Sequence, residues 1–107
     1  MAKYLIQGAY SVEGHKGLLK SGGSARRDAV SKAMESVGGR VEAFYFSFGT
    51  DDYAIIVDAP DNVSATALAL SVSASGALSG LRTTILLTPE EVDRATKMSV
   101  AYRPPGQ

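Results

Sequence analysis

The chain has 107 residues, with 11 Lys and Arg against 11 Asp and Glu, a single His, and neither Cys nor Trp. This length suits one domain with a single apolar core. A formal net charge of zero lacks the excess of positive charge that nucleic acids and anionic membranes attract. Without Cys, and with one imidazole, the chain has no disulfide, thiolate nucleophile, zinc-thiolate site or iron–sulfur cluster. We therefore expect no nucleic-acid partner, no metal and no cofactor.

The first ten residues carry one Lys and a short apolar stretch interrupted by Gln7 and Gly8, with no small-residue cleavage pattern. We expect no signal peptide and a cytoplasmic protein. The longest uncharged run, residues 62–81, contains five Ser, one Thr, one Asn and two Gly, which makes it too polar to span a bilayer. A membrane partner is not expected either.

The first part of the chain predicts a strand followed by a helix. Residues 3–10 alternate as a strand does. Residues 11–24 are rich in glycine and predict a loop with one or two helical turns at most. Ser24 is a suitable N-cap for a helix that ends at Gly38, a residue suited to the left-handed position after a helix. The apolar positions of this helix are Ala29, Val30, Ala33, Met34 and Val37.

The remaining residues predict a hairpin, a helix, a strand and a final helix. Residues 40–48 and 53–59 have strand composition, and residues 49–52 supply the turn between them. Asp61 or Asn62 caps a helix that runs to about Ser75, and residues 81–88 predict the last strand. The apolar stripe of the helix that follows Asp61 is predicted to be Val63, Thr66, Ala67, Leu70 and Ala74. The segment Thr88-Pro89-Glu90-Glu91 forms a capping box that begins a helix ending near Met98.

The order β-α-β-β-α-β with an extra C-terminal helix is the ferredoxin-like α+β arrangement. Right-handed crossovers place the strands at residues 3–10 and 53–59 in the centre of the sheet, with the other two at its edges. The sequence thus predicts a single domain over residues 1–107, with a core at about residues 3–88, a C-terminal helix at 89–99 and a tail at 100–107.

Both faces of the predicted sheet are apolar. The second strand places Phe44, Phe46 and Phe48 opposite Val41, Ala43 and Tyr45, residues 54–57 are apolar on both sides, and Ile85 and Leu87 lie opposite Leu86. Helices cover only one face, so we expect a second copy of the chain to pack sheet against sheet on the other, forming a homodimer and, as a further option, a trimer of dimers. The alternative is that the open face is merely patchy in its apolar character, or is partly covered by the C-terminal helix.

Several segments resemble the GYD-domain family of small bacterial proteins, a branch of the dimeric α/β-barrel proteins. They are Gly14, Arg26-Arg27-Asp28-Ala29, Gly38-Gly39, and Phe48-Gly49-Thr50-Asp51-Asp52 leading into Ile55-Ile56-Val57-Asp58-Ala59-Pro60-Asp61. The resemblance covers about residues 3–92. It implies the ferredoxin-like fold and a sheet-to-sheet dimer, but no established reaction. In the segment that names the family, Gly49 and Asp52 match while Asp51 stands where the family has Tyr, so a role for that ring does not carry over.

Two residues are candidates for catalysis. Asp52 begins a strand beside the hairpin, where a carboxylate can act as a general base or hold a ligand. The structural alternative is that it binds turn amides. His15 is the only imidazole and lies after the first strand, where it could face a pocket or simply be solvated. No metal cluster is predicted, because Asp51 and Asp52 belong to the hairpin and Asp61 is a cap.

Five residues are candidates for binding a ligand. Tyr10, Tyr45 and Tyr53 could line a cavity beside the sheet and orient a small aromatic or carbonyl compound, or simply pack in the core. Arg26 and Arg27 follow Gly22-Gly23-Ser24 at a helix start, where an anion could bind, with salt bridges between subunits as the alternative.

The function expected from these observations is a small-molecule binding or stress-response module built as a dimeric α/β barrel. Wider relatives include cofactor-independent monooxygenases and isomerases, so an enzyme acting on a small aromatic or carbonyl compound is the second hypothesis. A structural assembly subunit is the third. An enclosed cavity distinguishes the first two from the third, and a titratable group inside it distinguishes the enzyme.

Overall fold

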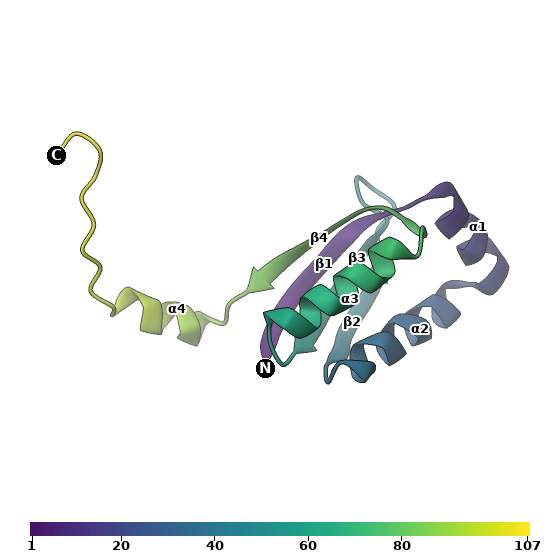
Figure 1. The fold of residues 1–107 in the computed structure, drawn as a ribbon, viewed down its shortest axis with the longest axis horizontal. Coiled ribbons are helices and arrows are strands. Elements are labelled where there is room, and N and C mark those ends of the chain that lie inside the picture. The colour runs from purple at the N-terminus through teal and green to yellow at the C-terminus, as the bar shows by residue number, and fades with distance from the viewer.

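The computed structural model describes residues 1–107 and contains a four-stranded antiparallel sheet in the order β2-β3-β1-β4 (Figure 1). This confirms the ferredoxin-like α+β fold and the central position of the first and third strands. In chain order, the elements are β1 (Ala2–Tyr10), α1 (Val12–Ser21), α2 (Gly23–Ser36), β2 (Arg40–Phe46), β3 (Tyr53–Ala59), α3 (Asn62–Ala74), β4 (Leu78–Leu86) and α4 (Pro89–Thr96).

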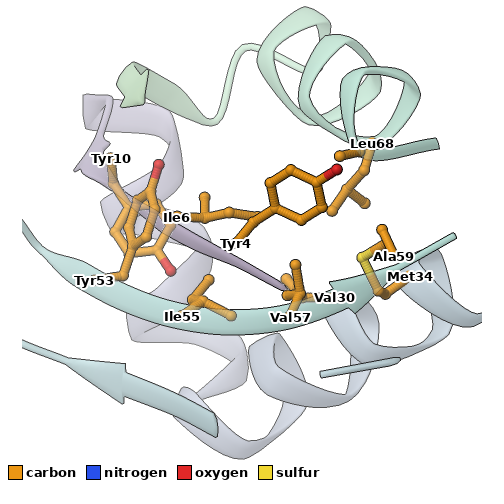
Figure 2. Close-up of a cluster of buried hydrophobic side chains, with 11 residues drawn as sticks. Tyr4, Ile6, Tyr10, Val30, Met34, Tyr53, Ile55, Val57, Ala59 and Leu68 are labelled. Atoms are coloured by element: carbon orange, nitrogen blue, oxygen red, sulfur yellow. The ribbon is translucent and has the colours of Figure 1, made fainter. Parts of the chain in front are cut away.

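The core lies between one face of the sheet and helices α2 and α3 (Figure 2). Alternate residues of β1 and β3 point into it because side chains change face at every position of a strand. Its buried members are Tyr4, Ile6, Tyr10, Val30, Met34, Tyr53, Ile55, Val57, Ala59, Ala65 and Leu68. Met34 and Val57 are fully buried, and burial of such side chains stabilises the fold by about 1.5–3 kcal/mol each. The opposite face of the sheet is not covered by any helix of the chain.

The glycine-rich segment after β1 is more regular than its composition predicts. Instead of a loop with one or two turns, it forms the ten-residue helix α1, whose N-cap Ser11 accepts a hydrogen bond from the Gly14 amide. Gly14 is needed for close packing, because a Cβ there would lie 2.0 Å from the carbonyl oxygen of Ala77. The predicted N-cap at Ser24 is also wrong, since α2 begins at Gly23 and its cap is Gly22, with φ 83°. Gly38 has φ 84°, as expected after a helix.

The side of helix α3 that packs against the core is not the predicted one. It begins after Asp61, whose side chain accepts from the Ser64 amide, as expected of a cap. Its buried residues are Ala65 and Leu68, whereas Val63 and Leu70 of the predicted stripe are 77% and 67% exposed. Small and apolar residues occur all round this helix, so the sequence pattern carries no signal for which side is buried.

The edge strands also differ from the prediction. Strand β2 ends at Phe46 rather than Phe48, and an irregularity between Val41 and Ala43 moves Val41 to the same face as Phe44. Strand β4 spans Leu78–Leu86, whereas residues 81–88 were predicted. It therefore begins three residues earlier and ends two residues earlier than predicted. Leu87 therefore lies outside the sheet.

The helix-free face is only partly buried within one chain. Leu5, Ala43 and Ile56 form its apolar middle, with Tyr45 68% exposed beside them. At one end, Asp58 lies 2.9 Å from Lys3 Nζ and 3.0 Å from Arg40 Nη2. Charged pairs thus border an apolar centre.

Helix α4 has the predicted capping box between Thr88 and Glu91 but ends at Thr96, before the expected Met98. It extends away from the sheet together with the C-terminal tail (Figure 1), and none of its residues is buried. The alternative in which this helix covers the open face is therefore wrong for the single chain. No helix of the protein has the length and apolar character required to cross a membrane.

Candidate functional site

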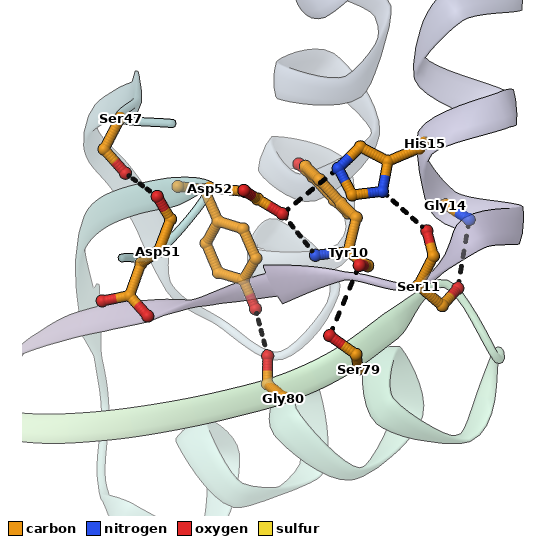
Figure 3. A network of polar contacts seen from close by, with 10 residues as sticks. Tyr10, Ser11, Gly14, His15, Ser47, Asp51, Asp52, Ser79 and Gly80 are labelled. Carbon is orange, nitrogen blue, oxygen red and sulfur yellow. Dashed lines mark hydrogen bonds and ion pairs between the residues drawn. The ribbon is translucent and has the colours of Figure 1, made fainter. Parts of the chain in front are cut away.

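A polar cluster joins the end of β1 to the β2–β3 hairpin and to α1 (Figure 3). Asp52 Oδ2 accepts a hydrogen bond from the Tyr10 amide at 3.0 Å and lies 3.3 Å from His15 Nε2. The Asp52 amide in turn donates to the Gly8 carbonyl at 2.7 Å. Asp52 therefore binds a strand amide rather than the turn amides that its position in the hairpin suggested.

Both ring nitrogens of His15 face acceptors. Nδ1 lies 2.9 Å from the Ser11 carbonyl oxygen, and Nε2 faces the Asp52 carboxylate. A carbonyl and a carboxylate accept hydrogen bonds, so both contacts are made in full only when each nitrogen carries a proton. His15 is half-exposed, with the edge of its ring toward Tyr10 at a centroid distance of 5.8 Å. Both of its ring nitrogens are therefore engaged with groups of the chain itself.

Two buried tyrosines lie side by side beneath this cluster. The rings of Tyr10 and Tyr53 have centroids 5.2 Å apart, and the Tyr53 hydroxyl donates to the Gly80 carbonyl at 3.1 Å. Gly8 makes room for that hydroxyl, because a Cβ at position 8 would lie 2.4 Å from it. Burial raises the pKa of Tyr53 to about 12 and also raises the pKa of Tyr10. Both hydroxyls are therefore protonated and neutral at physiological pH.

Arg26 lies with its guanidinium over the ring of Tyr10. Its guanidinium carbon lies 5.6 Å from the centroid of the Tyr10 ring, within the range of a cation–π contact. Its Nε atom is buried and has no hydrogen-bond partner. A buried N–H without an acceptor costs about 1–3 kcal/mol, and such groups in native proteins usually have a bound partner. The site therefore offers an unused, positively charged donor.

Two hollows meet at Tyr10 and Arg26. The inner one lies between the sheet and helices α2 and α3, is lined by apolar residues apart from Arg26, and has a volume of about 20 Å³. That is room for about one water molecule. The outer one is a groove of about 310 Å³ between α1 and α2, which contains Gly14, Gly17 and Ala25. Both hollows are lined in part by Tyr10 and Arg26.

The structure brings five of the seven candidate residues together and separates two. Tyr10, Tyr53, Arg26, His15 and Asp52 form one contiguous group. Tyr45 pairs with Ala54 and lies on the helix-free face, away from them. Arg27 points outward and pairs with Asp28 at 3.2 Å, so it does not share the position of Arg26.

Sequence reasoning missed the apolar lining of the inner hollow. Leu68, Ala69 and Val72 come from the side of α3 that was predicted to face away, and Leu78 and Leu81 come from β4. Knowledge of the β1–β4 register would have identified Leu81, because it pairs with Gly8. No group of three or more His, Asp or Glu side chains lies close enough to hold a metal ion.

The fold and this site define a ferredoxin-like α+β domain with an apolar pocket between its sheet and helices. The model of the GYD domain family matches residues 4–96, and the chain belongs to that family. No curated protein and no solved structure matches the chain.

Proposed function

We propose that this GYD-domain protein is a binding module for a small molecule that has an apolar, flat body and one anionic or carbonyl acceptor. The observation that carries the proposal is the buried, unpartnered Nε of Arg26 at the junction of the groove and the inner hollow. An acceptor bound there would replace a missing hydrogen bond with a charge-assisted one.

The chemistry of the walls supports this ligand class. Ten of the eleven residues that line the inner hollow are hydrophobic, and Tyr10 and Tyr53 present aromatic surfaces. Sites for small molecules commonly combine such apolar walls with few polar groups that fix orientation. The inner volume admits only part of a ligand, so the body of the molecule would occupy the groove between α1 and α2.

The geometry favours binding over catalysis. A cofactor-independent monooxygenase or isomerase would need a base beside its substrate. Asp52 Oδ2 already faces two donors, and both nitrogens of His15 face acceptors. Neither residue lines the inner hollow.

We further propose that two copies pack through their helix-free faces, as the resemblance implied. The apolar centre around Leu5 and Ile56 and its border of charged pairs resemble the core and rim of an interface. In such a dimer the helices and the Arg26 site of each copy remain on the outside.

The binding proposal is tested with protein purified without added ligand. Native mass spectrometry of this material reports any co-purified small molecule, and thermal unfolding is then measured with benzoate, salicylate and phenylacetate, using benzyl alcohol as the uncharged comparison. We expect the carboxylates to raise the unfolding temperature, because a ligand at 100 times its Kd stabilises the folded state by about 2.7 kcal/mol.

The matched pair of variants is Arg26→Gln and Arg27→Gln. Arg26→Gln should lose the response to carboxylates, whereas Arg27→Gln should keep it, because Arg27 lies outside the pocket on the neighbouring position of the same helix. Equal responses in the two variants, or no co-purified molecule together with no response to any carboxylate, would contradict the proposal.

A further inference from the structure

The C-terminal arm, residues 87–107, is unusual because its helix packs little against the rest of the chain. Helix α4 has eight residues, and none of them is buried. Isolated helices shorter than about 12–15 residues are marginal in water. The capping box of Thr88 and Glu91 contributes, but a cap is worth only about 1 kcal/mol. The helix therefore needs a surface to pack against.

The arm carries an apolar side suited to packing. Val92 and Ala95 are three residues apart and lie on one side of the helix, and Met98 follows two residues after the helix ends. Glu90, Asp93 and Arg94 lie on the other sides of the helix, and Glu91, four residues before Ala95, borders the apolar side. The apolar residues of the arm remain exposed, with Val92 at 45%, Met98 at 74%, Val100 at 77% and Tyr102 at 70%.

The same chain has an unfilled apolar surface on the outer side of α3. Residues 62–81, which include the whole helix, contain no charged residue. A groove of about 400 Å³ runs between α3 and β4, where Leu70 and Ile85 are 67% and 56% exposed. A second hollow of about 350 Å³ on α3 shares Leu70 with the first and includes Val63. The two form one continuous surface, which we call the α3 groove.

We propose that the arm of one copy docks in the α3 groove of a second copy, with Val92 packed against Leu70, and that the exchange is reciprocal. Residues of β4 line the groove, but no residue of the arm does. Figure 1 shows α4 extending away from α3. Reciprocal exchange fills both grooves and closes the assembly about a two-fold axis. The absence of charge on α3 suits the apolar side of α4 and leaves its charged sides in water.

The contact is tested by cross-linking, for which the absence of Cys from the chain is convenient. Val92→Cys and Leu70→Cys are made separately in full-length chains that differ in mass by a tag, mixed, allowed to exchange and oxidised. Both positions are exposed, so the variants should fold. We expect the mixed disulfide dimer to dominate the intact-mass spectrum, because side chains in contact bring Cα atoms within the distance that a disulfide spans.

The control is Leu19→Cys, at a position on α1 that is 88% exposed and outside both surfaces. A mixed dimer of Val92→Cys and Leu70→Cys no more abundant than the one with Leu19→Cys would overturn the proposal. So would a predominance of Leu70→Cys dimers, which would show two α3 helices packed together, or of Val92→Cys dimers, which would show two arms packed together.

Hydrogen exchange of the unmodified protein gives a second test. A docked α4 has protected amides, and docking on a second copy makes that protection decrease on dilution. We expect the peptide that contains residues 89–98 to lose protection between high and low protein concentration, while β1 and β3 keep theirs. Protection of α4 that is independent of concentration would place the arm on its own chain, and no protection at any concentration would show an undocked arm. Either result would overturn the proposal.

Discussion

Adjacent residues of α2 show how one position on a helix decides the role of a side chain. Arg26 and Arg27 have the same chemistry, yet Arg26 lies over the Tyr10 ring with a buried Nε, and Arg27 pairs in the open with Asp28. Consecutive residues of a helix lie about 100° apart around its axis. Only Arg26 is therefore directed toward the sheet, and only its charge bears on a ligand in the pocket.

Asp58 is a buried charged residue whose pKa makes the stability of the fold depend on pH. It is 7% exposed, and its hydrogen bond with Lys3, together with the nearby charges of Lys3 and Arg40, lowers the pKa of this carboxyl below its ordinary value. A carboxyl whose pKa is lowered by folding adds stability above its unfolded pKa of about 4, and loses that contribution as the pH falls through the folded value. The Lys3 pair therefore contributes fully at neutral pH and not in strong acid.

We predict that Asp58→Asn lowers the free energy of unfolding at pH 7 and flattens its decline below about pH 4, because the variant has no carboxyl to protonate at this position. Urea unfolding at a series of pH values measures both effects. Lys3→Met should flatten the acid decline as well, since the hydrogen bond from Lys3 is the largest cause of the shift. A profile for Asp58→Asn that runs parallel to that of the native protein would show that Asp58 does not contribute to acid unfolding.

At the scale of elements, α1 depends on close contact with the segment that joins α3 to β4. The Ser11 amide donates to the Ala77 carbonyl at 2.8 Å, and the Ser11 hydroxyl donates to the Gly76 carbonyl at 2.6 Å. Gly14 lies against the same Ala77 carbonyl. The helix thus approaches backbone, which cannot move aside as a flexible side chain can.

We predict opposite effects for alanine at two glycines of α1. Gly14→Ala should destabilise the fold by about 1–3 kcal/mol, the usual cost of overpacking, because its Cβ would lie 2.0 Å from the Ala77 oxygen. Gly17→Ala should stabilise it by about 0.5–1 kcal/mol, because nothing lies within 4 Å of a Cβ there and alanine is the better helix former. Urea denaturation compares the two, and a Gly14→Ala variant as stable as Gly17→Ala would refute the close contact in solution.

Elements with local signals were predictable, and those shaped by distant contacts were not. The capping box of α4 and the strand at residues 53–59 lie where their own residues indicate, because caps and strand propensity act within a few residues. Helix α1 was missed because glycine is a poor helix former, and Gly14 is present for its close contact with the Ala77 carbonyl, about 60 residues later in the chain. The buried side of α3 was wrong because only the sheet, not its own composition, selects that side.

The candidate site was predictable as a set of residues but not as an arrangement. Each candidate was suggested by its own side-chain chemistry: Tyr10, Arg26, His15 and Asp52. The proximity of Tyr10 and Asp52 instead follows from the pairing of β1 with β3, in which Gly8 lies opposite Tyr53. That pairing also explains the separation of Tyr45. Its partner is Ala54, the neighbour of Tyr53, so the two tyrosines point to opposite faces of the sheet.

At the scale of the whole molecule, the single chain leaves two apolar surfaces open to water. One is the middle of the helix-free face, and the other is the α3 groove with its unpartnered arm. The first is bordered by charged pairs that fix its outline: Lys3 with Glu42 and Asp58 at one end, and Arg82 with Asp51 at the other. Since the sheet separates the two surfaces, each can be disrupted without the other.

We predict that Tyr45→Lys converts a sheet-to-sheet dimer into smaller species. Tyr45 is 68% exposed in the single chain, so the substitution should leave the fold intact, but a lysine charge there would be buried against the second copy without a partner. Sedimentation velocity over a range of concentrations measures the change in mass. Val12→Lys is the matched control, because Val12 is 71% exposed on α1, away from the helix-free face, and should keep the native mass. If Tyr45→Lys and Val12→Lys sediment alike at every concentration, the helix-free face does not form the dimer.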